Sequence, residues 1–323
     1  MDKVVISEEG FWNYFCKKGL RRSAIRKIGY FLRGFDVKII CYLRRQDQWL
    51  ESYYHQIVKS EVTERSRMPI NEFVEYQEKN GMLDYFGVLS DLANEFGTEN
   101  IHIKPFEKEQ WLNSNIIDDF CSILSIYCIE GAAIPNALQV RLTNAACIFS
   151  LIFNRLPGAE TAKERLTHIL VRINKYNNTQ RILPKIIAER VLSQYKETNR
   201  NVVRHFLRNR EELFNDNRIS LDYEDYPGLS IGELAEIVAY IFIDRQSRID
   251  RIVQLSEHIR NTEWGAGNGQ PYVELINNPK LSIGELAEIV ASIFIDQGSL
   301  HIPLKSNGLS GVKSEVHANC DKI

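Results

Sequence analysis

The sequence feature that most constrains the fold is the run VKIICYL at residues 37–43, which is apolar at almost every position. Such a continuous run is typical of a strand that is covered on both faces, as strands of parallel sheets are. Two further short apolar runs, VVIS (4–7) and IHIKPF (101–106), are separated from it by stretches with helical periodicity. Because strands that alternate with helices favour a parallel sheet, we predict an α/β core over about residues 1–115.

The residues after the central run follow a helical pattern. Trp49, Tyr53 and Ile57 recur every four residues, and Ser52 falls on a different face. Asp47 precedes this pattern and is predicted to be the N-cap of the helix. The chain therefore passes from a buried strand directly into a helix.

The second half of the chain is predicted to be mainly helical. Strand signals fade after about residue 116. Amphipathic helical patterns follow in 116–126, 137–155 and 183–214. We assign residues 116–215 to a helical part that completes one domain over 1–215. The polar ending at 301–323 is predicted to be disordered.

An internal repeat marks a helical extension over 216–300. LSIGELAEIVAYIFID (229–244) returns as LSIGELAEIVASIFID (281–296), and each copy begins with the capping-box pattern Ser-x-x-Glu. We predict two amphipathic helices. Packing or pairing of these helices, including formation of a homo-oligomer, is favoured over a catalytic role.

Composition excludes several classes of protein. The 40 Lys and Arg residues against 42 Asp and Glu give a formal charge of -2, so no overall field attracts nucleic acid or a membrane. No nucleic-acid-binding motif, membrane-length apolar run or signal-peptide pattern is present. The six cysteines have neither CxxC nor metal-ligand spacing, so we expect reduced thiols, a cytoplasmic location and no metal.

The junction at Arg44 has the physical properties of an anion site. A helix N-terminus offers free N–H groups and a favourable dipole, and a guanidinium grips phosphate through two hydrogen bonds. Ligands of open parallel sheets bind beyond the carboxyl ends of the strands, where Arg44 is expected. Ser52 adds a hydroxyl in the helix. The alternative is that Arg44 and Arg45 form surface salt bridges and that Ser52 is simply exposed.

The segment VKIICYLRRQDQWLESYYHQ (37–56) resembles the element of sulfotransferases that binds the 3'-phosphate of 3'-phosphoadenosine 5'-phosphosulfate (PAPS). That element is a strand, Arg, seven residues and Ser, commonly followed by Tyr-Tyr. The resemblance implies that Arg44 and Ser52 bind this phosphate. Three other segments are similar to the bacterial branch of the family, which is linked to sulfation of glycans and other surface molecules: 2–12, 101–126 and 195–214.

The resemblance covers roughly residues 1–215 and implies transfer of a sulfuryl group from PAPS to a hydroxyl, with a carbohydrate as the expected acceptor. The family places a histidine or glutamate near the end of the strand before the 3'-phosphate element. By this correspondence Glu8 is the candidate general base, and Glu9 is its competitor. The alternative for Glu8 is a carboxylate that stabilises a helix N-terminus.

One family element is not found in the sequence. Members carry a Gly-rich loop with Lys or Arg and Ser or Thr around the 5'-phosphosulfate, after a first strand. Here residue 4 already falls in the strand expected to follow that loop, and WGAGNGQP (264–271) lacks the Lys-Ser/Thr ending. The expected fold is thus a P-loop-type three-layer parallel sheet core, N-terminally truncated, with a mainly helical C-terminal half. The alternative function is a non-catalytic remnant that serves as a nucleotide-binding or protein-interaction module.

Two basic segments have open interpretations. KKGLRRSAIRKIGYFLR (17–33) carries seven Lys and Arg residues and no acid, which suits an anionic acceptor, a membrane surface or a solvated helix face. Arg200, Arg204 and Arg208 are spaced four apart. They form a stripe that suits either a phosphate or acidic glycan, or ordinary surface charge.

Overall fold

A computed structural model describes residues 4–7, 10–17, 19–126, 141–173, 180–207, 210–215 and 223–246. The predictions for Glu8, Glu9, the second repeat copy and the tail 301–323 lie outside these residues. The named helices and strands follow in this order: α1 (Gly10–Cys16), α2 (Arg21–Phe31), β1 (Ile39–Leu43), α3 (Gln46–Ser60), α4 (Ile70–Lys79), α5 (Tyr85–Phe96), β2 (Ile101–Pro105), α6 (Ile116–Leu124), α7 (Asn144–Asn154), α8 (Ala159–Arg172) and α9 (Lys185–Phe206).

The described sheet has two parallel strands. β1 pairs with β2 in a register that runs from Ile39 opposite Ile101 to Leu43 opposite Pro105. Alternate residues of both strands enter a buried cluster with α5, where Leu43, Ile101 and Ile103 are at most 6% exposed. The predicted α/β class and the strands expected in 37–43 and 101–106 are therefore confirmed.

The strand predicted at residues 4–7 is wrong. This segment has no regular secondary structure, and the side chains of Val4 and Ile6 are 86% and 67% exposed. A short apolar run forms a strand only where a neighbouring edge supplies hydrogen bonds to its backbone. Within the described residues, the sheet consists of β1 and β2 alone.

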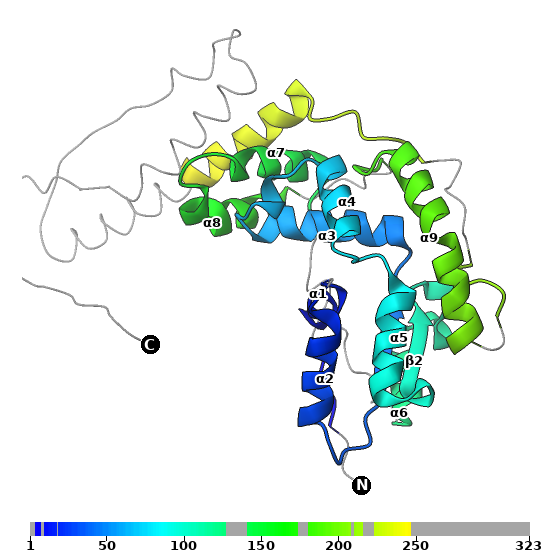
Figure 1. The fold of residues 1–323 in the computed structure, drawn as a ribbon. Coiled ribbons are helices and arrows are strands. Elements are labelled where there is room, and N and C mark those ends of the chain that lie inside the picture. The colour runs from blue at the N-terminus through cyan, green and yellow to red at the C-terminus, as the bar shows by residue number, and fades with distance from the viewer. Residues whose placement is uncertain are drawn as a thin grey trace, which may run out of the picture.

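A second, larger core is helical, as the sequence predicts. Figure 1 shows α7 and α8 beside α3 and α4, with α9 running from this group toward β2. The helix over 231–246 covers the same core through Leu234, Ile237 and Ile241, each at most 2% exposed. The first repeat copy also forms the predicted capping box. The Ser230 N–H donates to the Glu233 carboxylate at 2.9 Å, and the Glu233 N–H donates to Ser230 Oγ at 3.2 Å.

Helix α3 links the two cores. Its buried Leu50, Tyr54 and Val58 belong to the helical core, whereas the partly buried Trp49 contacts both cores. At its N-terminus, the side-chain amides of Gln46 and Asn199 exchange hydrogen bonds of 2.7 and 3.1 Å with each other. This pair fixes the start of α3 against the middle of α9.

The prediction that Asp47 is the N-cap of α3 is wrong. The N-cap is Arg45, with φ -54° and ψ 136°, and Asp47 lies in the first turn. The Asp47 carboxylate does not cap the backbone because the Arg45 guanidinium holds it through two hydrogen bonds of 2.8 and 2.9 Å. The ion pair with Arg45, two positions earlier in the chain, takes the place of the capping interaction.

The expectation of six reduced cysteines is also wrong. Cys121 is disulfide-bonded, whereas Cys16, Cys41 and Cys147 are free thiols. The spacing of the cysteines did not reveal this bond, although the cytoplasmic prediction depended on reduced thiols. Among the residues that the structure describes, no helix combines the length and apolar character required to cross a membrane.

Candidate functional site

The carboxyl ends of the two strands bring Arg44 and Phe106 together. Arg44 follows β1 and Phe106 follows β2, and the Phe106 N–H donates to Leu43 O at 2.6 Å. The guanidinium carbon of Arg44 lies 4.3 Å from the centre of the Phe106 ring, and Trp111 packs edge-on against that ring. Arg44 is thus positioned by a cation–π contact at the edge where ligands of parallel sheets bind.

Arg45, the other arginine of the junction, has a different role. It is 6% exposed and pairs with the fully buried Asp47. Asp47 places a negative charge in the first turn of α3, where the helix dipole favours an anion. This pair was not predicted, although an acid two positions after the second arginine is a signal for it in the sequence.

Ser52 lies on the outward side of α3. It is half-buried, while Glu51 and Tyr54 of the same helix are buried. The Arg44 guanidinium lies over the Phe106 ring, and the Arg44 carbonyl accepts a hydrogen bond of 2.6 Å from the Tyr85 hydroxyl. The structure therefore supports the position of the arginine at the sheet edge, and joint binding of phosphate by Arg44 and Ser52 stays a prediction.

A cavity of about 410 Å³ lies at the last turns of α9 and the segment after it. Its lining consists of Arg200, Val203, Arg204, Leu207, Arg210 and Glu211. The Arg210 guanidinium donates to Gln110, whose side-chain amide donates to Glu107. Because Glu107 directly follows Phe106, one wall of the arginine cavity contacts the loop at the carboxyl end of β2.

The arginine cavity gathers three guanidinium groups, and acidic side chains lie among them. Glu197 pairs with Arg204 at 2.7 Å and with Arg200 at 3.6 Å, and the hydrogen bond from Arg204 lowers the pKa of Glu197. Arg200 also lies 3.9 Å from Glu212. The predicted arginine stripe thus contributes two of the cavity's cations, and Arg208 lies outside the described residues. Arg210, which the stripe did not include, is the third.

Glu51 and His55 form a separate buried cluster on α3. Glu51, 1% exposed, accepts hydrogen bonds from Arg141 at 2.9 Å, from the Ile182 N–H at 2.9 Å and from Arg181. Burial, followed by the charge of Arg141, holds the pKa of His55 well below its ordinary value. These contacts clamp the chain around residue 181 onto α3, which is a structural role.

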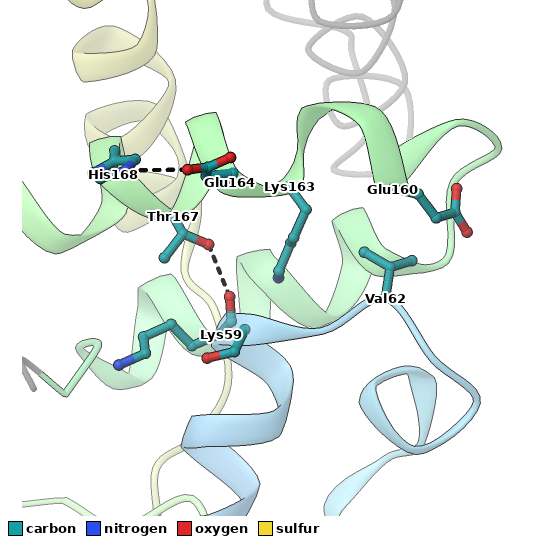
Figure 2. Close-up of a pocket in the computed structure, with 8 residues that line it drawn as sticks. Lys59, Val62, Glu160, Lys163, Glu164, Thr167 and His168 are labelled. Carbon is teal, nitrogen blue, oxygen red and sulfur yellow. Dashed lines mark hydrogen bonds and ion pairs between the residues drawn. The ribbon is translucent and has the colours of Figure 1, made fainter. Parts of the chain in front are cut away.

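A second cavity, of about 420 Å³, lies between the end of α3 and α8 (Figure 2). Lys163 on its wall is 5% exposed, and its ammonium group donates to Val58 O at 2.5 Å, Ser150 Oγ at 2.6 Å and Asn154 Oδ1 at 2.7 Å. Burial lowers the pKa of Lys163 to about 7. The three acceptors oppose this shift because together they satisfy all three protons of the charged form.

The polar groups of this second cavity are occupied by one another. Glu164 and His168 lie 4.0 Å apart on α8, and Thr167 Oγ1 donates to Lys59 O at 2.8 Å, as Figure 2 shows. The side chain of Lys163 extends toward α3, away from the Glu164–His168 pair. The groups do not converge on one point, so the arginine cavity beside Arg44 is the better candidate site.

The described part of the chain contains no cluster of three or more His, Cys, Asp or Glu side chains arranged to hold a metal ion. The chain is 27% identical over 206 residues to an uncharacterized protein of Archaeoglobus fulgidus. The match covers 63% of this chain and about half, 53%, of that protein. No protein-family model matches the chain, and no solved structure matches it.

Proposed function

We propose that the protein is a sulfotransferase-like protein that binds PAPS and transfers its sulfuryl group to a hydroxyl of a carbohydrate. The observation that carries the proposal is the arginine cavity beside the carboxyl ends of β1 and β2, with Arg44 at the same edge. PAPS carries several negative charges, and guanidinium groups bind phosphate and sulfate oxygens in a bidentate manner.

In this proposal Arg44 and Ser52 bind the 3'-phosphate, and the arginines of α9 stabilise the remaining negative charge. Sulfuryl transfer needs positive or N–H groups around the moving group and a base beside the acceptor hydroxyl, for which Glu8 is the candidate. The proposal includes a P-loop-type three-layer core, of which β1 and β2 would be two neighbouring strands. The loop for the 5'-phosphosulfate has no counterpart in the sequence.

A second candidate function is binding of the nucleotide without transfer. The observation that favours it is that the sequence has no Gly-rich loop with Lys or Arg to stabilise the sulfuryl group and the 5'-phosphate, although Arg44 is present for the 3'-phosphate. The other version of this candidate, a protein-interaction module built on the repeated helices, has less support, because the first copy packs its apolar face into the core of its own chain.

The test is calorimetric titration of the chain with 3'-phosphoadenosine 5'-phosphate, in parallel with Arg44→Ala, Arg210→Ala and the exposed control Arg26→Ala. Because a hydrogen bond to a charged group contributes about 1.5–3 kcal/mol, we expect each of the first two variants to bind about 10- to 100-fold more weakly. The control should bind like the unmodified chain. Equal binding by all four proteins, or no binding by the folded chain, contradicts the nucleotide site.

Transfer is tested separately with radiolabelled PAPS and a panel of hydroxyl-bearing sugars. Label in the sugar fraction that disappears in Arg44→Ala supports the transferase. Nucleotide binding without any labelled product, across the panel, supports the binding module instead.

A further inference from the structure

The end of α2 and the turn after it form a surface that the proposed function does not use. We call this surface the α2 tip, and it consists of Arg26, Lys27, Tyr30, Phe31, Arg33 and Phe35, all of which are exposed. Helical spacing places Arg26, Lys27 and Tyr30 on the side of α2 opposite the buried Ile25. Figure 1 shows that the turn between α2 and β1 projects at the periphery of the molecule.

The aromatic side chains of the α2 tip are unusually exposed. Phe31 and Phe35 are 77% and 73% exposed, and Tyr30 is 62% exposed. The Tyr30 and Phe31 rings contact each other edge-on at 5.9 Å. The turn between the two phenylalanines is closed by a hydrogen bond from the Phe35 N–H to Leu32 O, and Gly34 adopts a φ of +89° that few other residues tolerate. Two bare phenyl rings therefore stand on either side of one tight turn.

The cations of the α2 tip differ from those at the start of the same helix. There, Arg21 and Arg22 both pair with Asp91 of α5, at 3.7 and 3.0 Å. Within the described residues, Arg26, Lys27 and Arg33 form no ion pair. Arg33 lies over the Tyr30 ring at 5.0 Å. The outward face thus keeps its positive charge although the whole chain has a formal charge of -2.

We propose that the α2 tip docks the protein on the surface of an anionic lipid bilayer. The charges match, because Lys and Arg are attracted to acidic headgroups while exposed aromatic rings enter the interface between headgroups and acyl chains. Phe31 and Phe35 favour this partner over a nucleic acid. They stand on either side of a tight turn, and transfer of a phenyl ring from water into the apolar part of a bilayer is favourable.

The test is flotation of the full chain with vesicles at about 0.1 M salt, using phosphatidylcholine with about 30% phosphatidylserine and, as the neutral reference, phosphatidylcholine alone. We expect the chain to float with the acidic vesicles only. Raising the salt to about 1 M shortens the screening length from about 10 to about 3 Å and should release most of the protein. This result needs no variant and is independent of the nucleotide site.

Variants separate the two parts of the surface. Arg26→Gln/Lys27→Gln/Arg33→Gln should reduce partitioning about 100-fold, because each cation near an acidic surface contributes roughly a factor of five. Phe31→Ser/Phe35→Ser should reduce it at least tenfold. The matched controls are Lys79→Gln/Lys108→Gln/Lys196→Gln, three exposed cations elsewhere, and Ile186→Ser/Ile231→Ser, two side chains that are each 75% exposed. Both controls should partition like the unmodified chain, and circular dichroism checks the fold of every variant.

Three outcomes of the vesicle experiments overturn the proposal, and a fourth comes from competition with DNA. The chain stays at the bottom of the gradient with acidic vesicles, it floats equally with neutral vesicles, or the control variants lose as much partitioning as the α2-tip variants. Competition with single- and double-stranded DNA decides between the two anionic partners. Displacement from acidic vesicles by DNA at equal charge concentration would assign the surface to nucleic acid instead.

Discussion

Each end of α3 has a buried charged side chain beside it, but the two charges have different kinds of partner. At the N-terminus, where the helix dipole is positive, the chain buries the Asp47 carboxylate and neutralises it with Arg45. At the C-terminus, where the dipole is negative, it buries the Lys163 ammonium against Val58 O. The first charge has an opposite charge as its partner. The second has hydrogen bonds to three neutral oxygens.

This difference shows that burial of a charge does not require a salt bridge. Lys163 retains three acceptors and a favourable helix end, and these offset part of the cost of removing an ammonium group from water. The cost that remains is visible in its pKa, which burial lowers to about 7. At the N-terminal end, Arg45 and Asp47 neutralise each other, and removal of either residue leaves the other as a buried charge without an opposite charge.

The largest expected effect is therefore at the N-terminal end. Asp47→Ala should lower the free energy of unfolding by about 4 kcal/mol, because it strands the buried Arg45 guanidinium. Urea denaturation measures the change. Asp36→Ala, at an exposed acid in the turn before β1, is the control and should change stability by less than about 0.5 kcal/mol. A loss below about 1 kcal/mol for Asp47→Ala would mean that Arg45 reaches solvent when its partner is removed.

A smaller loss is expected at the C-terminal end. Lys163→Met keeps the length of the side chain but leaves three buried oxygens with one donor fewer, so we expect a loss of about 3 kcal/mol. Lys196→Met, at an exposed position of α9, is the matched control. If Lys163→Met is as stable as the unmodified chain, the neutral packing of methionine compensates for the lost network, as buried ion pairs sometimes allow.

The prediction becomes sharper when the free energies of unfolding of the unmodified chain and of Lys163→Met are compared as a function of pH. The folded amine loses its proton near pH 7, whereas the unfolded amine keeps it up to about 10.5. Between these values the unfolded state binds more protons, so stability should rise with pH for the unmodified chain relative to Lys163→Met. A difference that is constant from pH 7 to pH 10 would show that the three acceptors keep the ammonium charged.

The smallest effect on stability is expected at the sheet edge itself. Arg44→Ala removes a half-exposed guanidinium from the Phe106 ring, a contact that contributes about 0.5–1 kcal/mol. The same denaturation experiment measures it. Substitution of Arg44 would then weaken nucleotide binding with little loss of stability, whereas Arg45 belongs to a buried ion pair that contributes to stability. A loss of 3 kcal/mol or more would assign Arg44 to the structural core of the junction.

The strands and several helices could be predicted from local patterns alone. The apolar runs at 37–43 and 101–106 became β1 and β2, and the helices predicted in 116–126, 137–155 and 183–214 correspond to α6, α7 and α9. β1, β2, α7 and α9 bury apolar side chains of their own, whereas the buried side chain of α6 is Asp119. The run at 4–7 is also apolar but has no neighbouring strand in the described structure, and Val4 and Ile6 stay exposed.

The site could be predicted only in part. The position of Arg44 followed from the end of a strand, and two cavity arginines followed from their spacing of four. Arg210 joins them through its contact with Gln110, one hundred residues earlier in the chain, and no local pattern encodes such a contact. The network around Lys163 also depends on tertiary packing, since its three acceptors come from α3 and α7.

The amide pair between Gln46 and Asn199 has a consequence for how the chain is made. The two residues are 153 positions apart, and both are buried. At a synthesis rate of about 5–20 residues per second, Gln46 leaves the ribosome roughly 8–30 s before Asn199 exists. During translation, the Gln46 amide at the strand–helix junction therefore forms its hydrogen bonds with Asn199 only after α9 has been synthesised. Premature release of a chain that ends before residue 199 would leave this polar group to be satisfied by water, with the junction unable to close.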